Sequence, residues 1–266
     1  MYRAFNVKLK YDFIEQNFAS QYNYKYKILN SNCKKDLEKI VNSSDKISAD
    51  QIKKLITPAN QYDIFISHSH KDLELAKRLA GYIESKFKLT CFVDSLYWGN
   101  IDELQEELNK SHLTHDDKTG TNYFKHQSTM EVAKHANMIL ASALTQMIDC
   151  SECVFFLNTD NSVICGADAI SKNETYSPWI YHEVFTTSII QRKKPGRKLI
   201  TENFQARDRA EKDWPQIAYG LDLSRMTNLN NIDFQNWWKK NSSGNYASSL
   251  DSLYEIKPED EYNKQK

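Results

Sequence analysis

The sequence predicts an α/β fold with a parallel sheet and helices on both of its faces. Short apolar runs rich in β-forming residues recur along the chain, and segments with apolar residues at helical spacing separate them. The 266 residues are enough for one large domain, or for a medium domain with an appendage. Strands that alternate with helices pair in parallel, and ligands bind at the edge where their carboxyl ends meet.

The elements follow from these two periodicities. Apolar runs and alternation predict strands, at residues 2–9, 62–67, 89–93, 153–157 and 197–201, and a short one near residue 226. Helical spacing predicts helices, at 31–56 (one or two, with Ser48 capping the second), 72–86, 101–108, 129–147, 179–191 and 234–240. Residues 94–100 are expected to form a loop.

Composition divides the chain into three parts. Residues 1–60 are polar and predict an N-terminal extension of mixed helix and strand. Residues 61–240 hold the alternating elements and form the main domain, with a polar insertion near 110–128 that is expected to loop out. Residues 241–266 are expected to be a weakly ordered tail.

Charge and cysteine content bound the partners and the compartment. The 35 Lys and Arg balance the 35 Asp and Glu, so nothing in the net charge favours nucleic acid or an anionic membrane as partner. No stretch approaches the ~18–20 consecutive apolar residues of a membrane span, and the first ten residues do not resemble a signal peptide. Five scattered cysteines suit a reducing compartment. We therefore expect a cytoplasmic protein.

Metal and cofactor motifs are weak. Cys150 and Cys153 form a lone CxxC with no second pair at zinc spacing, and we expect structural thiols. A polar cluster lies in the insertion, at His112, His115, Asp116 and Asp117, and a flexible polar loop explains it more simply than a metal does. The chain has no P-loop and no GxGxxG. We expect neither a metal nor a bound cofactor.

Three motifs carry the functional signal. Residues 62–69 read Tyr-Asp-Ile-Phe-Ile-Ser-His-Ser, and Lys-Asp follows at the start of the next helix. Phe-Val-Asp ends the second strand at Asp94. Ser-Pro-Trp-Ile-Tyr-His-Glu spans residues 177–183. In this order they resemble the TIR (Toll/interleukin-1 receptor) family, above all its bacterial members, over about two thirds of the chain. The resemblance implies the flavodoxin-like TIR fold, with Asp94 opening the BB loop.

The resemblance also implies an enzyme that cleaves NAD⁺ at the nicotinamide–ribose bond, with Glu183 as the catalytic carboxylate. The bond to be cleaved joins the anomeric carbon to a cationic pyridinium, so nicotinamide is a good leaving group and needs no general acid. One carboxylate can stabilise the oxocarbenium-like transition state and hold the ribose hydroxyls. NAD⁺ would be the substrate, and no cofactor is needed. The acceptor stays open: water would give ADP-ribose, an intramolecular attack a cyclic ADP-ribose, and another nucleophile a conjugate.

Seven further residues are expected to contact this substrate: Ser67, His68, Ser69, Asp94, Tyr97, Trp98 and Trp179. The first six follow two strands at the carboxyl edge of the sheet, and the last lies on one helix face with Glu183. Plainer interpretations exist for four of these sites. Glu183 could be a solvated charge near a helix start, Trp179 a core residue, His68 a surface-loop residue and Asp94 a turn or cap.

The resemblance extends to a biological role and to partners. Bacterial TIR proteins of this kind resemble the sensor components of antiphage defence, as in Thoeris-like systems, where the nucleotide product activates a separate effector protein. Self-association through TIR domains is also implied. The alternative is a non-enzymatic TIR–TIR interaction module. Adaptors generally lack the Trp-plus-Glu pair, so Trp179 and Glu183 favour the enzyme.

Overall fold

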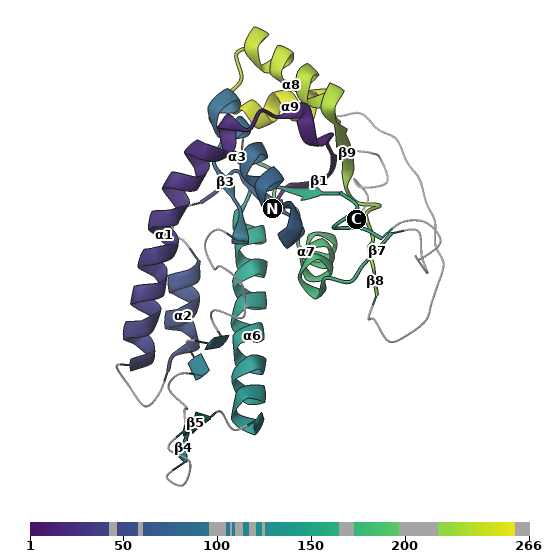
Figure 1. Cartoon of the computed structure of the whole chain (residues 1–266). Helices are drawn as coiled ribbons and strands as arrows, with labels where there is room; N and C mark the ends of the chain where they lie inside the picture. Colours follow the sequence, from purple (N-terminus) through teal and green to yellow (C-terminus); the bar gives the residue numbers. More distant parts are fainter. Residues whose placement is uncertain are drawn as a thin grey trace. The chain divides into compact units, whose positions relative to one another are not determined.

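The computed structural model is an α/β protein whose five-stranded sheet is entirely parallel and is flanked by helices (Figure 1), which confirms the predicted fold class. The structure describes residues 1–42, 47–57, 61–95, 105–106, 108–109, 114–116, 121–123, 126–164, 173–196 and 218–258. The sheet has the order β3-β2-β6-β1-β9. Among the described residues, no helix combines the length and the apolar character needed to cross a membrane.

The strands of this sheet lie where the apolar runs predict them. Their bounds are Arg3–Lys8 (β1), Ile64–Ser67 (β2), Cys91–Phe92 (β3), Cys153–Leu157 (β6) and Thr227–Asn230 (β9). The strand expected at 197–201 lies outside the described residues. Glu174–Thr175 (β7) and Tyr219–Gly220 (β8) form a separate antiparallel pair.

The N-terminal strand occupies an interior position of the sheet. A flavodoxin-like sheet has the order 2-1-3-4-5, and β3-β2-β6 reproduces its first three places. The fourth place is taken by β1, which pairs with β6 on one side and β9 on the other. Residues 1–60, expected to be an extension, therefore contribute a buried strand to the sheet. Local patterning shows that a strand forms, but it does not show where in the sheet that strand is placed.

The chain forms two compact units, and their limits differ from the boundaries expected at residues 60 and 240. The first comprises residues 1–22, 62–93 and 148–266 and holds the five-stranded sheet. The second comprises 23–61 and 94–147. It contains most of α1 (Asn17–Asn42) and α6 (His126–Cys150), together with α2 (Ala49–Ile56). As predicted, Ser48 caps α2, its side chain accepting a hydrogen bond from the Gln51 N–H.

The polar insertion is more ordered than expected. Thr114–Asp116 (β4) and Thr121–Tyr123 (β5) pair as an antiparallel hairpin, and α6 begins soon afterwards at His126. The prediction of a looped-out segment did not include these strands, which pair apart from the main sheet. Short polar strands that pair only with each other show no apolar alternation, so the pattern could not reveal them.

Aromatic side chains fill one face of the main sheet. Phe5 and Phe155 are register partners on β1 and β6, with ring centroids 5.4 Å apart. Phe234 and Trp237 of α8 (Asn231–Ser243) pack against Phe155 from above. The Trp237 ring also stacks at 3.7 Å on Phe87, the last residue of α3 (Leu73–Phe87). Helices α3 and α8 therefore cover the same face.

The opposite face is covered by α7 (Pro178–Ile189), which lies across the sheet from α8 in Figure 1. Ser67, Phe156, Asn6 and Asn228 are successive register partners, so their side chains share one face. The Ser67 hydroxyl meets a side chain of α7 on that face. Phe5 and Phe155, one residue along their strands, point to the other face.

The segment that was expected to be a weakly ordered tail contains a helix, which the sequence analysis did not predict. Helix α9 (Ser249–Ile256) has a capping box in which Ser248 and Asp251 exchange hydrogen bonds, and it buries Leu250, Leu253 and Tyr254. The polar residues between α8 and α9 hid this helix, because Ser248 was not recognised as an N-cap.

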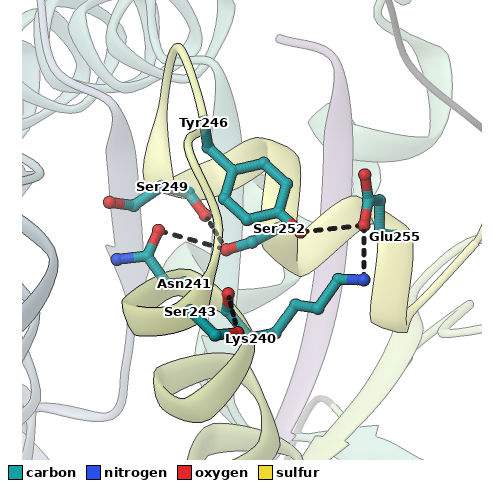
Figure 2. A network of polar contacts seen from close by, with 7 residues as sticks. All are labelled: Lys240, Asn241, Ser243, Tyr246, Ser249, Ser252 and Glu255. Carbon is teal, nitrogen blue, oxygen red and sulfur yellow. Dashed lines mark hydrogen bonds and ion pairs between the residues drawn. The ribbon is translucent and has the colours of Figure 1, made fainter.

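A polar network joins α8 to α9 (Figure 2). Lys240 Nζ lies 2.9 Å from Glu255 Oε2, and the Tyr246 hydroxyl donates to the same oxygen at 2.9 Å. The Lys240 hydrogen bond holds the pKa of the Glu255 carboxyl below its ordinary value. Ser252 donates to Asn241 Oδ1 at 3.3 Å and so adds a second link between the two helices.

We expect Gly81→Ala to destabilise the fold although it lies inside helix α3. A Cβ at residue 81 would sit 2.3 Å from the Phe18 carbonyl oxygen, which belongs to rigid backbone. Overpacking of this kind costs about 1–3 kcal/mol, more than the ~1 kcal/mol that alanine gains over glycine in a helix. Urea unfolding of the variant beside Ser85→Ala, an exposed position on α3, checks this. An unchanged midpoint for Gly81→Ala would contradict the close approach.

The fold should lose stability at alkaline pH. Burial raises the pKa of the Cys153 thiol and of the Tyr254 phenol well above their ordinary values. The folded chain therefore keeps both protons while the unfolded chain releases them, so stability is full below the unfolded pKa values and falls as pH rises from roughly 8.5 to 11. Urea midpoints at pH 8 and pH 10.5 measure the loss. Tyr254→Phe and Cys153→Ala should each reduce it, and equal losses in all three proteins would rule out these groups.

Candidate functional site

Two residues far apart in the sequence meet at the carboxyl edge of the sheet. Ser67 ends β2, and its Oγ donates a 2.5 Å hydrogen bond to Oε2 of Glu183 on α7. Both side chains are buried, with exposed fractions of 1% and 2%. Helix α7 starts with Ser177 as N-cap and Pro178 at the first helical position, which places Glu183 in the second turn.

The burial of Glu183 contradicts the plainer interpretation of a solvated charge at a helix start. Glu183 is 2% exposed and accepts a hydrogen bond from Ser67, so its carboxyl group does not lie in solvent. A buried carboxylate at the ligand-binding edge of a parallel sheet is a candidate for a functional site. Glu183 is therefore a buried carboxylate at the carboxyl edge of the sheet, and its catalytic role stays a prediction.

Three further predicted residues flank this pair. His68 directly follows β2 and is buried, with Nδ1 3.3 Å from the Ile66 carbonyl oxygen, so the surface-loop interpretation is wrong. Ser69 is half-buried and occupies the N-cap position of the short 3₁₀ helix His70–Asp72, without a capping hydrogen bond from its side chain. Trp179 is half-buried on α7, one turn before Glu183.

The residues predicted from the second motif are placed differently. Asp94 belongs to the second compact unit, where it is half-buried and helical together with Ser95 in place of the expected loop. The Ser95 hydroxyl donates to Asp94 Oδ1 at 3.5 Å. Tyr97 and Trp98 lie outside the described residues. The predicted substrate contacts of these three residues stay predictions.

Sequence reasoning missed a buried carboxylate beside this edge. Asp72, at the start of α3, accepts hydrogen bonds from the loop that follows β6: Thr159 at 2.5 Å, Asn161 at 2.7 Å and Ser162 at 3.4 Å. Asp72 therefore fastens that loop to α3. The signal available in the sequence was the run of small polar residues directly after the apolar strand 153–157, which predicts a structured turn.

A chain of amides on the α7 face was also missed. Asn158 Nδ2 donates to Asn6 Oδ1 at 2.9 Å, and Asn6 Nδ2 donates to Asn228 Oδ1 at 2.8 Å. Asn6 is the register partner of Phe156, which in turn partners Ser67, so two strand spacings of ~4.8 Å separate Asn6 from Ser67. Only the sheet order, with β1 in its interior, brings these polar groups to the edge that carries Glu183.

The described residues contain no group of three or more His, Cys, Asp or Glu side chains arranged to hold a metal ion. His112 and Asp117 lie outside them. Cys150 is exposed at the end of α6 and Cys153 is buried on β6, both as free thiols, as expected for structural cysteines.

No protein-family model, curated protein or solved structure matches this chain. The resemblance to the TIR family therefore stays a prediction that depends on the three motifs. The structure adds to it the parallel sheet and the position of two motif residues, Ser67 and Glu183, within one hydrogen bond of each other.

Proposed function

We propose that this protein is an NAD⁺-cleaving enzyme of the TIR type, a glycohydrolase or an ADP-ribosyl cyclase, with Glu183 as its catalytic carboxylate. The observation that carries the proposal is the buried Glu183 carboxylate on α7, which accepts a hydrogen bond from Ser67 at the carboxyl end of β2. The order of the three motifs along the chain supports the same assignment.

The chemistry needs one well-placed negative charge. As the bond between ribose C1′ and the nicotinamide nitrogen breaks, its electron pair neutralises the pyridinium and positive charge develops on the ribose. A carboxylate in a water-poor environment stabilises that charge more strongly than it would in bulk water. Ser67 fixes the carboxylate orientation. The acceptor then bonds to C1′. It is water, which releases a proton to solvent, or a nucleophilic atom of the same nucleotide or of another molecule.

Other residues would bind the dinucleotide. His68 and Ser69 follow Ser67 at the same edge, and Trp179 lies one turn from Glu183 with an indole that can stack on a base. Asp94, Tyr97 and Trp98 are proposed as further contacts on the strength of the motif resemblance alone. The same resemblance supports self-association, a nucleotide product that a separate effector protein detects, a role in antiphage signalling and a cytoplasmic location.

One observation favours the alternative of an interaction module. Phe185 and Ile189 lie four residues apart on α7 and are 45% and 65% exposed. Tyr181 stacks between Phe185 and Tyr219, with centroid distances of 5.9 Å and 4.9 Å. Exposed apolar side chains in a row are typical of protein contact surfaces. Helix α7 could therefore serve association, with or without catalysis on its buried side.

The deciding experiment measures NAD⁺ loss and product mass by chromatography and mass spectrometry. Wild type, Glu183→Ala and the control Glu74→Ala, an exposed carboxylate on α3, are each assayed as purified protein and in cells under phage challenge. NAD⁺ loss with wild type and Glu74→Ala but not with Glu183→Ala supports the enzyme, and the product mass identifies the acceptor. If no protein consumes NAD⁺ in either setting while wild type self-associates, the interaction module replaces it.

A further inference from the structure

Helix α3 carries a buried cation that has no acidic partner. Arg78 is 4% exposed, and its Nη2 donates to the Tyr11 hydroxyl at 3.2 Å. Its Cζ lies 4.5 Å from the centroid of the same tyrosine ring. The Arg78 Nε is buried and has no hydrogen-bond partner. Across the part of the chain that the structure describes, no carboxylate forms an ion pair with this guanidinium.

This arrangement is costly for an arginine. A guanidinium does not lose its proton in proteins, so burial cannot be relieved by neutralisation. Arg3, a second buried arginine among the described residues of the first unit, has more hydrogen-bond acceptors. Its guanidinium donates to two backbone carbonyls and to the Thr227 hydroxyl, and it lies over two aromatic rings. Arg78 donates to one phenol, and its buried Nε has no hydrogen-bond partner.

The side chain that contacts the Arg78 guanidinium is itself exposed. The segment that follows β1 crosses α3 directly after Arg78, where Gly81 lets the Phe18 backbone approach and where Tyr82 contacts the Phe18 ring at 5.5 Å. Tyr11 lies at the near end of this segment and is 55% exposed. The phenol that accepts the Arg78 hydrogen bond therefore belongs to a side chain that reaches solvent.

The surroundings are mixed in charge and include two free lysines. Lys8 and Lys10 are exposed and lead from the carboxyl end of β1 into Tyr11. Asp12 and Glu15 are exposed in the same segment, but neither comes within ion-pair distance of Arg78, and Glu15 accepts from the Asn17 side chain instead. The chain next to Tyr11 therefore carries two cations as well as two carboxylates.

We propose that Arg78 and Tyr11 form a binding site for a phosphate group at the carboxyl end of β1. The guanidinium fork matches two oxygens of a phosphate, and the Tyr11 hydroxyl, released from Arg78, can donate to a third. Because α3 covers the face of the sheet opposite to α7, this site is separate from the Glu183 carboxylate. It does not depend on whether the chain cleaves NAD⁺.

The test is calorimetric titration of the full chain with inorganic phosphate, pyrophosphate and ADP at constant ionic strength. Wild type is compared with Arg78→Met, Arg78→Lys and the control Lys134→Met, which removes an exposed charge on α6. Loss of the charged hydrogen bonds should raise the Kd of Arg78→Met by about 10- to 100-fold, with a smaller rise for Arg78→Lys and none for the control. Equal affinity for pyrophosphate and ADP identifies the phosphate groups alone as the ligand, and tighter binding of ADP than of pyrophosphate identifies a nucleotide.

A stability measurement separates this role from a structural one. Without ligand, Arg78→Met should unfold at the same or a higher urea concentration than wild type, because methionine fills the site without a buried charge. Added phosphate should raise the wild-type midpoint but not that of Arg78→Met. The proposal is overturned if wild type binds none of the three ligands, or if both Arg78 variants bind them as tightly as wild type.

Discussion

Glu183→Gln should lower the rate of NAD⁺ cleavage by about 10³-fold while leaving the fold intact. Glutamine has the shape of glutamate and can still accept the Ser67 hydrogen bond, so the packing of α7 on the sheet is kept. It lacks the negative charge that stabilises the developing oxocarbenium ion, and losses of ~10²–10⁴-fold are usual for such groups. The initial rate of nicotinamide release measures the effect, with the urea midpoint as the control for folding.

A double-mutant cycle tests whether Ser67 acts through Glu183. Ser67→Ala should lower the rate by about 10-fold, because the carboxylate loses its orienting hydroxyl. The double variant should be no slower than Glu183→Gln alone, since Ser67 has no charge left to position. If the fold-losses of the two single variants multiply in the double variant, Ser67 contacts the substrate independently of Glu183. A Glu183→Gln enzyme with wild-type rate would exclude Glu183 from catalysis.

Arg3→Ala should cause the largest loss of stability among single substitutions, about 3–5 kcal/mol. Arg3 is buried on β1 and donates to the carbonyl oxygens of Lys257 and Pro258 at the end of α9. It also donates to Thr227 of β9 at 2.8 Å, and its guanidinium covers the Tyr254 ring. Alanine would leave the carbonyls without a donor, open a cavity and release α9 from the sheet.

Urea unfolding followed by circular dichroism measures this loss. Lys8→Ala, an exposed position on the same strand, is the matched control and should change the free energy of unfolding by less than ~0.5 kcal/mol. Arg3→Lys should fall between the two, because an ammonium can reach one carbonyl but cannot bridge three acceptors. A loss below ~1 kcal/mol for Arg3→Ala would mean that α9 does not depend on this contact.

Local pattern predicted most elements of the fold because their apolar residues repeat with the period of a strand or helix. The strand at 153–157 has the predicted bounds, and Ser48 caps α2 as predicted. The hairpin β4–β5 escaped prediction because it carries no apolar alternation. The interior place of β1 escaped because strand order depends on pairings between distant segments, which no local pattern records.

The candidate site shows the same division. The motif resemblance drew attention to Ser67 and Glu183, and the structure joins them by a hydrogen bond. Nothing in the sequence showed that Asp72 fastens the loop after β6, or that Asn6 lies in a row of amides beside that loop. Arg78 looked like an ordinary charged helix residue, because its burial results from the β1–α1 segment that crosses it.

The position of β1 sets the order of events when the chain is made. Phe5 pairs with Phe155 on one side and with Thr227 on the other, so β1 leaves the ribosome well before both strands with which it pairs. Pairings across such long separations close slowly, and until they close the edges of the unfinished strands are open to wrong partners. Glu183 is translated before β9, so the sheet around it is completed only after residues 227–230 have emerged. A ribosome-bound chain arrested before that point should therefore lack the folded site, and chaperones that shield apolar strands should matter more for this protein than for a sheet assembled in sequence order.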